Sequence, residues 1–446
     1  MYDVVIVGAR CAGSPTAMLL ARKGYRVLLV DRATFPSDSM STHYIHQHGV
    51  SRLERWGLLD RVKASNCPPI RKLRIQFGKY VLAGVPPPVD GIRDGYSPRR
   101  KLLDNILVDG AVQAGVELRE GFNVQNVVFH GDRVIGIRGN SPNAPFVEER
   151  ARIVVGADGL HSMVARAVRP REYFVKPTLC CAYYTYWSGI ELDGFEVYRS
   201  DRRLIFAMPT NNGLTCIGVA WPRNEWDAYR SDFEANYLAT IDTFPGLGVR
   251  VRNARREERF TGTGTLPNYY RQPYGSGWAL VGDAGFHKDP TTANGISDAF
   301  RDAELLAAAI DAGFSGRGDL AGALSMYERG RNRASLSTYN LFTNHIATFE
   351  PLRPAFIELV RALRGNQAAT DQFMGALVGA VPVSAVFSRS KMLSTMGIGG
   401  FVRAMRTQLS RVFFGVDYSC DAGDCEVYLP DDTNEPDTGQ TGHSGL

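Results

Sequence analysis

The residues with the clearest chemical potential lie in the first thirty-one positions of the chain. The segment 8–13 (GARCAG) follows a short apolar run, and Asp31 follows a second one. Gly8 permits a tight turn out of a strand, and Gly13 permits close packing of the next helix, whose start offers N–H groups to a pyrophosphate. Asp31 is placed to accept hydrogen bonds from ribose hydroxyls. This segment predicts a strand–turn–helix–strand unit that binds a dinucleotide.

The middle position of this turn departs from the usual pattern. Arg10 occupies the place of a glycine, where the backbone normally approaches the phosphates. A guanidinium at this position can lean over the pyrophosphate and neutralise part of its charge. We therefore expect Arg10 to support the binding of an anionic cofactor.

Two later segments also place an aspartate directly after a buried strand. Asp158 lies in the segment 156–162 (GADGLHS), which can equally be a turn in which the carboxylate caps a helix. Asp283 follows a short apolar strand and precedes a loop that reaches Gly295. An aspartate at such a strand end can reach a ribityl hydroxyl, and the loop can present N–H groups to an anionic ring edge.

The order and spacing of these segments resemble the flavin monooxygenase superfamily typified by para-hydroxybenzoate hydroxylase. The geranylgeranyl reductases and flavin-dependent halogenases share that scaffold. The turn at 8–13, Arg100 with Asp104, Asp158, and Asp283 match its four motifs, and the resemblance covers roughly residues 1–345. It implies an FAD cofactor. The cofactor-binding residues implied are Gly8, Ala12, Gly13, Asp31, Arg32, Arg100, Val124, Asp158, Asp283, Pro290, Gly295 and Ile296.

The resemblance also implies a role for several of these residues. Asp31 would hold the ribose, and Arg100 and Asp283 would contact the pyrophosphate and ribityl region. Gly295, with the residue after it, would face the pyrimidine edge of the flavin. Asp158 would support the FAD site and the approach of the reductant.

The leading functional hypothesis is a monooxygenase. NADPH or NADH would reduce FAD, dioxygen would add at the flavin C4a carbon, and the hydroperoxide would oxygenate a small aromatic or conjugated substrate. The sequence has no second glycine-rich dinucleotide unit, which fits a family whose nicotinamide has no domain of its own. A double-bond reductase of the geranylgeranyl reductase type is the closest alternative. A halogenase is less favoured, because the segment 183–188 (YYTYWS) does not match Trp-x-Trp-x-Ile-Pro, and a flavin-binding protein without turnover also stays open.

The catalytic residues are not fixed by the sequence. His43, His46 and His48 share one loop without a clear carboxylate or cysteine partner, so we expect no metal there. They are solvated loop residues, or one of them contacts cofactor or substrate. The candidates are His46, His287, Lys288 and Asp289; Lys288 and Asp289 either orient substrate or pair with each other on the loop.

An aromatic segment marks the expected substrate region. Tyr184 and Tyr186 lie in a stretch rich in tyrosine and tryptophan, and together with Pro290 they are the predicted substrate contacts. Because side chains of a strand alternate between two faces, only some of these aromatic residues can line a pocket. The others would pack in a core.

The pattern of elements predicts an α/β fold. We expect a Rossmann-type FAD-binding domain, an antiparallel β-sheet substrate domain and a C-terminal helical region, which would pack on the body, cover the pocket, mediate dimerisation or touch a membrane surface. The predicted boundaries are 1–64, 100–174 and 276–345 for the discontinuous FAD-binding domain; 65–99 and 175–275 for the sheet domain; 346–416 for the helices; and 417–446 for an acidic tail.

Composition narrows the remaining possibilities. The 446 residues are 44% hydrophobic and 22% charged with a formal net charge of +5, and no basic stripe indicates nucleic-acid binding. Seven cysteines, mostly in apolar stretches, suit a reducing compartment. No secretion signal or stable membrane span is expected, so we predict a cytoplasmic monomer or homodimer that acts on a small organic molecule.

Overall fold

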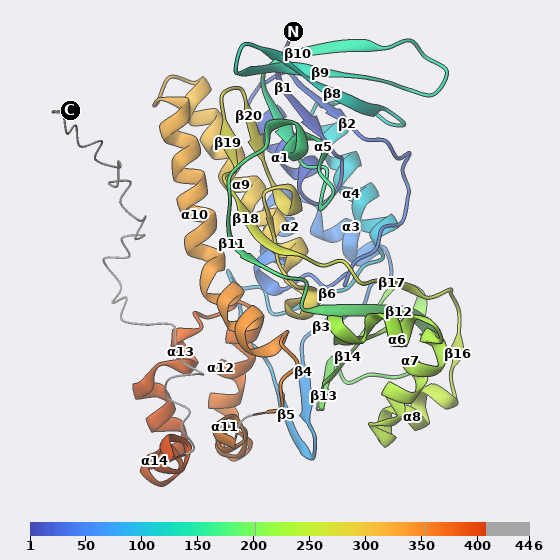
Figure 1. The fold of residues 1–446 in the computed structure, drawn as a ribbon, viewed down its shortest axis with the longest axis vertical. Helices are drawn as coiled ribbons and strands as arrows, with labels where there is room; N and C mark the ends of the chain where they lie inside the picture. Colours follow the sequence, from blue (N-terminus) through green and yellow to red (C-terminus); the bar gives the residue numbers. More distant parts are fainter. Residues whose placement is uncertain (201, 353, 407–446) are drawn as a thin grey trace, which may run out of the picture.

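The computed structural model describes residues 1–200, 202–352 and 354–406. Two β-sheets divide the molecule into halves, one above the other in Figure 1. The upper half in that view holds a largely parallel sheet flanked by long helices, and the lower half holds a largely antiparallel sheet. The chain passes between the halves several times, so neither is one continuous segment. The expected α/β fold class is confirmed.

Strands β1 (Tyr2–Val7) and β2 (Val27–Val30) run parallel at the centre of the upper sheet. Their nearly unbroken apolar sequence reflects a sheet that is covered on both faces. Alternate residues of β1 face opposite sides, since Val4 packs with helices and Val5 packs with a second layer of strands. The order is β19-β20-β10-β1-β2-β7, where the outer strands are β7 (Glu117–Arg119), β10 (Val147–Gly156), β19 (Tyr274–Gly275) and β20 (Trp278–Leu280).

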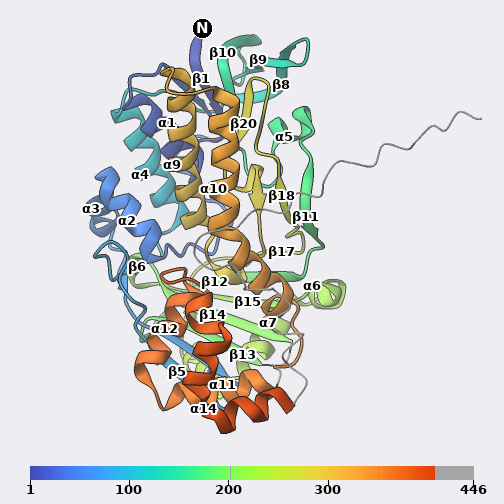
Figure 2. The same ribbon diagram turned by 90° about the vertical axis from the view of Figure 1, so that its left-hand side faces the viewer.

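A layer of helices covers one face of this sheet. The two longest, α9 and α10, run alongside each other in Figure 2. Glycine residues allow close helix packing, and a Cβ on Gly110 would lie 3.0 Å from the side chain of Leu58. The helices of this layer are α1 (Gly13–Ala21), α2 (Gln47–Trp56), α3 (Leu59–Ala64), α4 (Arg100–Gln113), α9 (Gly295–Phe314) and α10 (Leu320–Leu341).

An antiparallel meander covers the opposite face. It consists of β8 (Asn123–His130), β9 (Arg133–Asn140) and the first part of β10, with α5 (Met163–Val168) beside it. Val116 leads into β7, which joins the parallel sheet beside β2 and lies outside the meander. Helix α4 returns the chain to the sheet edge before the meander begins.

The lower sheet has the order β16-β12-β15-β14-β13-β4-β5, with β17 also paired to β12. All pairs are antiparallel except β13 with β4. Residues 211–213 connect β14 to β15, and Asn212 takes φ +62° there, a conformation that asparagine tolerates. The strands are β4 (Leu73–Phe77), β5 (Tyr80–Gly84), β12 (Cys180–Ser188), β13 (Phe195–Ser200), β14 (Arg203–Pro209), β15 (Thr215–Pro222), β16 (Arg255–Arg256) and β17 (Thr261–Thr263).

Three helices cover the face of the lower sheet that points away from the upper half. They are α6 (Trp226–Arg230), α7 (Phe233–Asp242) and α8 (Pro245–Arg252), and the sequence reading had expected mainly strands in this region. They bury Trp187 and Trp221, whose indole N–H groups donate hydrogen bonds to hydroxyls of α7. This face is therefore a core.

The C-terminal helices pack on the edge of the lower sheet formed by β4 and β5 (Figure 2). They are α11 (Pro354–Arg364), α12 (Gln367–Leu377), α13 (Ser384–Phe387) and α14 (Arg389–Arg406). Within the described ranges, none of the helices combines the length and apolar character that crossing a membrane requires. The predicted acidic tail, 417–446, lies outside the described residues.

Short strands connect the two halves. The three-stranded sheet β11 (Glu172–Lys176), β18 (Asn268–Arg271) and β21 (Phe286–His287) runs along the side of the molecule, and β3 (Pro69–Ile70) pairs with β6 (Gly95–Tyr96). Strand β21 leads through a single 3-10 turn into α9. That loop lies between the upper and lower sheets.

Candidate active site

One cavity of about 740 Å³ extends from the carboxyl ends of β1 and β2 to the lower sheet. Residues of both halves line it, including the loop between β21 and α9. Of the predicted cofactor residues, all but Gly13 line this cavity: Gly8, Ala12, Asp31, Arg32, Arg100, Val124, Asp158, Asp283, Pro290, Gly295 and Ile296.

Two glycines make the first turn possible. Gly8 has φ +104°, and a Cβ on it would lie 2.4 Å from the carbonyl oxygen of Ala157. A Cβ on Gly13 would lie 1.7 Å from the carbonyl oxygen of Gly8. Gly13 therefore permits close packing of α1 on the turn, and it does not border the cavity.

Asp31 stands at the carboxyl end of β2 with its carboxylate already oriented. The backbone N–H of Ala9 donates to Oδ2 at 2.7 Å, and that of Ala33 donates to Oδ1 at 2.8 Å. The residue is 8% exposed and borders the cavity. A fixed carboxylate at this strand end suits the hydroxyl pair of a ribose.

Two guanidinium groups share one buried carboxylate below the turn. Asp104 accepts hydrogen bonds from Nε and Nη2 of Arg100, both at 3.0 Å, and from Arg10 at 2.5 Å. Asp104 has no exposed surface, whereas both arginines border the cavity. Burial alone would lower the pKa of Arg100, but Asp104 raises it, so the guanidinium stays charged. The three side chains carry a formal charge of +1, which suits an anion.

The position of Arg10 differs from the expectation that it leans freely over a pyrophosphate. Its guanidinium is held by Asp104 and also donates to the hydroxyl of Ser37 at 2.8 Å. The ring of Phe35 lies 5.3 Å from the guanidinium carbon. Arg10 therefore contributes positive potential from a fixed position.

The carboxylate of Asp158 lies at the N-terminus of helix α5, whose N-cap residue is Ser162. It accepts hydrogen bonds from the backbone N–H groups of Met163, at 2.6 Å, and Val164, at 3.2 Å, and from the hydroxyl of Ser162. Burial raises its pKa. Asp158 borders the cavity, but these local bonds account for the motif as a helix cap.

Asp283 lies in a 3-10 turn, Gly282–Ala284, directly after β20. Its side chain is exposed and borders the cavity, and it acts electrostatically on Arg100. Gly282 has φ +63°, and a Cβ there would lie 2.7 Å from Cβ of Ala12. The first and the last of the four motifs therefore touch each other.

Three polar candidates, His287, Lys288 and Asp289, lie where β21 leads into the loop before α9, but their surroundings differ. His287 and Lys288 border the cavity, and Nδ1 of His287 is hydrogen-bonded to the carbonyl oxygen of Pro267. Asp289 is fully buried and does not border the cavity. Its carboxylate caps the 3-10 turn by accepting from the N–H of Thr291 at 3.0 Å, and burial raises its pKa. Asp289 is therefore a structural cap and not a residue that meets substrate.

The three loop histidines, expected either to be solvated or to include one that contacts cofactor or substrate, are mostly buried. His43 has no exposed surface and His46 has 1%, and neither borders the cavity. The backbone N–H of His46 donates to the hydroxyl of Ser297 at 3.1 Å, and His46 is the residue directly before α2. Burial, with Arg100 nearby, lowers the pKa of His43 to about 3, so this imidazole is neutral at pH 7. His46 is thus removed from any position that touches substrate.

The two predicted substrate tyrosines lie on the same face of β12 but at different depths. Tyr184 borders the cavity, and its hydroxyl accepts from the N–H of Ser41 at 3.4 Å. Tyr186 lies behind it, hydrogen-bonded to His43, with the guanidinium of Arg99 3.9 Å above its ring. The prediction for Tyr186 as a direct contact is therefore not supported by its position.

The predicted site residues did not include the loop of residues 38–42, which lies beside Tyr184. Residues 38–42 border the cavity, and Asp38 is tied to Arg99 at 2.7 Å. Arg99 also pairs with Glu258 at 2.6 Å. Arg99 stood unnoticed beside the motif residue Arg100, and the only available signal was a pair of adjacent arginines at a helix start.

Comparison with known proteins agrees with this geometry. A family model described as an FAD binding domain matches residues 1–338. The digeranylgeranylglycerophospholipid reductase of Methanosarcina acetivorans is 27% identical over 347 residues, which cover 74% of this chain and 80% of that protein. The fold is similar to that of the flavin-dependent brominase Bmp2, with a TM-score of 0.74, 19% identity, and coverage of 91% of this chain and 98% of that one. PqsL of P. aeruginosa in complex with 2-aminobenzoylacetate gives a TM-score of 0.65 at 22% identity, covering 78% and 97%.

The chain belongs to the FAD-binding family, and the resemblance to flavin monooxygenases and geranylgeranyl reductases is confirmed. It is an FAD-dependent oxidoreductase. The residues at one end of the cavity fit that cofactor. The carboxylate of Asp31 is held in position there, Arg10 and Arg100 supply positive charge, and the turn that Gly8 and Gly13 make possible lies beside them. Among the described residues, no cluster of three or more histidine, cysteine or carboxylate side chains is arranged to hold a metal.

Proposed function

We propose that this flavoprotein is a monooxygenase that uses NADPH or NADH and dioxygen to oxygenate a small aromatic or conjugated molecule. One observation carries the proposal: the cavity runs without interruption from the cofactor end to a largely apolar wall of the lower sheet. A substrate on that wall would face the loop at which α9 begins. When bound there, FAD would supply the redox chemistry.

The wall is suited to a flat or extended apolar body. Its side chains come from neighbouring strands, so they form one continuous surface. Apolar contact excludes water from the reacting atoms and strengthens the electrostatic interactions that remain. The wall residues include Ala182, Tyr184, Phe195, Val197, Leu204, Phe206, Met208 and Ala220.

The residues at the other end would hold the cofactor. Asp31 would bind the adenosine ribose, Arg100 and Asp283 would meet the pyrophosphate and ribityl chain, and Gly295 would face the pyrimidine edge. Helix α9 begins at Gly295, so its N-terminal dipole end would stabilise negative charge on that edge. Asp158 would support this end of the site.

The proposal is tested by following both oxygen and substrate. The purified protein, loaded with FAD, is mixed with NADPH or NADH and a panel of aromatic and conjugated compounds under ¹⁸O₂. We expect a compound that accelerates nicotinamide oxidation to gain one ¹⁸O atom, detected by mass spectrometry. A colourless protein that does not take up flavin would contradict the FAD assignment, and accelerated turnover without oxygen incorporation would contradict the monooxygenase.

A double-bond reductase is the second candidate, favoured by the similarity to digeranylgeranylglycerophospholipid reductase. The apolar wall would also suit an isoprenoid chain. Anaerobic conditions separate the two candidates, since a reductase would oxidise chemically reduced FAD with an alkene as acceptor and add two hydrogens to it. Halide incorporation would indicate a halogenase, and an absence of turnover under all conditions would leave a flavin-binding protein.

Location and assembly complete the proposal. A cytoplasmic enzyme would have access to NADPH and NADH, and its free cysteines would stay reduced there. We propose a monomer or homodimer. Size-exclusion chromatography with light scattering measures the assembly directly.

A further inference from the structure

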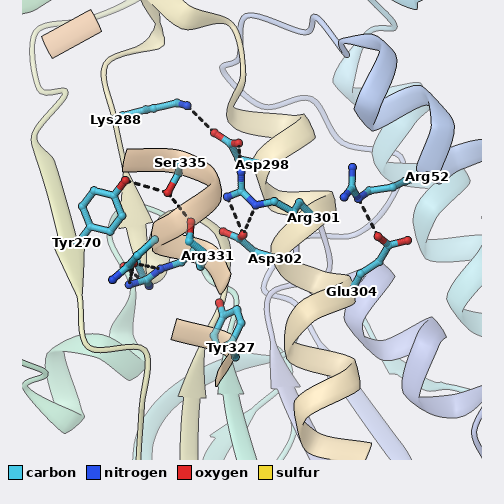
Figure 3. Close-up of polar contacts among 12 residues, drawn as sticks. Arg52, Tyr270, Lys288, Asp298, Arg301, Asp302, Glu304, Tyr327, Arg331 and Ser335 are labelled. Carbon is cyan, nitrogen blue, oxygen red and sulfur yellow. Dashed lines mark hydrogen bonds and ion pairs between the residues drawn. The ribbon is translucent and has the colours of Figure 1, made fainter. Parts of the chain in front are cut away.

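Four charged side chains form a buried chain beside the cavity (Figure 3). Nζ of Lys288 lies 2.7 Å from Oδ2 of Asp298, and Nη1 of Arg301 lies 2.6 Å from Oδ1 of the same carboxylate. Arg301 also pairs with Asp302 at 2.7 Å. Lys288 belongs to the loop before α9, whereas the other three belong to α9 itself. The chain therefore fastens the loop to the helix.

The ammonium group of Lys288 has binding capacity left. It carries three N–H donors, and the residues that the structure describes provide it with one carboxylate, Asp298, and the face of the Phe286 ring at 5.6 Å. Its side chain is 5% exposed and borders the cavity. The remaining N–H donors of the ammonium group can therefore bind an acceptor that lies in the cavity.

Asp298 neutralises Lys288 only in part, because it serves two cations. Burial alone would raise the pKa of Asp298, but Lys288 and Arg301 hold it well below its usual range, so it is ionised. A third cation, Arg331, is fully buried, lies near the chain in Figure 3 and donates to the carbonyl oxygens of Gly285, at 3.0 Å, and Arg271, at 3.1 Å.

Counting charges shows which sign is in excess near the loop. Lys288, Arg301 and Arg331 are three cations beside the two carboxylates that pair with Lys288 and Arg301, namely Asp298 and Asp302. The loop also holds the carboxylate of Asp289, but burial raises its pKa and it is engaged in capping the 3-10 turn through the N–H of Thr291. Another nearby carboxylate, Glu328, is partly exposed and is linked to Arg331 through the hydroxyl of Tyr173. A buried excess of positive charge is costly unless an anion accompanies it.

The same construction occurs at the other end of the cavity. There Asp104 is shared by Arg10 and Arg100, and the proposed occupant is the pyrophosphate of FAD. A carboxylate shared by two cations leaves each cation able to attract a further anion while fixing its position. Lys288 repeats this arrangement where the apolar wall of the lower sheet meets α9.

We propose that Lys288 binds an anionic group of the substrate. This inference rests on the proposed function, and it narrows the substrate class to an apolar, aromatic or conjugated body that carries a carboxylate or an equivalent anion. Asp298 and Arg301 are positioning residues, since they hold the ammonium at the edge of the cavity. The apolar body would lie on the lower sheet, with its anion at the loop.

The test measures ligand binding to FAD-loaded protein and needs no turnover. The probes are 2-naphthoate and naphthalene-2-carboxamide, which share a shape but differ in charge. Binding is followed through the absorbance of the flavin and by calorimetry. We expect 2-naphthoate to bind more tightly than the amide, and Lys288→Met to weaken 2-naphthoate roughly 10- to 100-fold, the effect of losing a charge-assisted hydrogen bond. Binding of the amide should change little.

Two variants separate charge from folding. Lys288→Arg keeps the cation and should retain 2-naphthoate within about threefold, less than the loss of one charged hydrogen bond. Arg52→Met removes another ion pair with α9, to Glu304 at 2.8 Å, and neither residue borders the cavity, so it should leave both probes unaffected (Figure 3). If Lys288→Met does not fold, Lys288→Gln takes its place in the same assay.

Several outcomes would overturn the inference. Equal binding of the two probes, no binding of 2-naphthoate, or unchanged binding in Lys288→Met would each show that Lys288 does not select an anion. A loss of FAD affinity in Lys288→Met as large as its loss of 2-naphthoate would assign the lysine to the cofactor. Selective binding of 2-naphthoate, combined with accelerated nicotinamide oxidation and no oxygen incorporation for the compounds of the panel, would support Lys288 and contradict the monooxygenase alone.

Discussion

Asp104 and Asp298 are both buried carboxylates that hold two cations at the edge of one cavity, but their neighbours differ. In the part of the chain that the structure describes, both cations of Asp104 form their ion pairs with that single carboxylate, and the three side chains carry a formal charge of +1. Arg301, in contrast, has Asp302 as a second partner, so the four-membered chain around Asp298 is formally balanced before Arg331 is counted. The first group suits a multiply charged cofactor. The second suits a ligand of smaller charge.

The largest expected effect follows from removing the carboxylate at the cofactor end. Asp104→Asn leaves Arg10 and Arg100 next to each other without a counter-charge, so we expect the free energy of unfolding to fall by about 3–5 kcal/mol. Urea denaturation of the FAD-free protein measures it. A loss below about 1 kcal/mol, as for a surface ion pair, would show that the two arginines do not depend on Asp104.

The next largest effect is expected on FAD affinity, which should distinguish the cofactor end of the cavity from the substrate end. Asp31→Ala removes a preset acceptor for the ribose, and we expect FAD binding to weaken roughly 10- to 100-fold, the effect of losing charged hydrogen bonds. Quenching of flavin fluorescence on titrating the FAD-free protein gives the dissociation constant. Equal weakening in Lys288→Met would erase the distinction between a cofactor end and a substrate end.

Acid should lower the free energy of unfolding of the protein through His43. Its folded pKa of about 3 lies below the ordinary value of 6.5, so the unfolded chain takes up the proton first as the pH falls. The associated stability is complete above pH 6.5 and is lost progressively between pH 6.5 and 3, by about 2 kcal/mol at pH 5. His43→Asn, which suits the φ of +59° at this position, should reduce that part of the loss. The free energy of unfolding is measured by urea denaturation between pH 7 and 5. An identical pH dependence in the unchanged protein and in His43→Asn would contradict this role of His43.

A smaller effect is expected at the second carboxylate. Asp298→Asn leaves Lys288 without a charged partner, but Arg301 keeps Asp302, so we expect a loss of about 1–2 kcal/mol in the free energy of unfolding. Glu304→Gln, at the more exposed pair with Arg52, should cost less than about 1 kcal/mol and serves as the control on the same helix. A cost for Asp298→Asn equal to that for Asp104→Asn would contradict the difference between the groups.

The sequence predicted the parts of the site that depend on local pattern. Gly8, Asp31 and Asp283 could be placed because each follows a short buried strand, and the carboxyl ends of parallel strands meet at one edge of a sheet. The FAD-binding family followed from the order of these motifs.

The remainder depends on contacts between segments that lie far apart in the chain. Helices α6 to α8 are short, and α6 and α7 contain aromatic residues, so propensity alone did not separate them from strands. Burial of His43 depends on Tyr186, 143 positions away. The pairing of Lys288 with Asp298 requires the loop to fold back on α9, which spacing in the sequence does not specify.

Every wall of the cavity comes from a different part of the chain, including residues 7–12, 157–166, 182–220 and 282–302. No folding fragment short of nearly the whole FAD-binding region and sheet could therefore possess the cavity. A cofactor that bridges these segments binds the native state alone and deepens its stability, by about 2.7 kcal/mol when free FAD is at 100 times its dissociation constant. Flavin supply in the cell would then govern how much of this protein persists, apart from how fast it works.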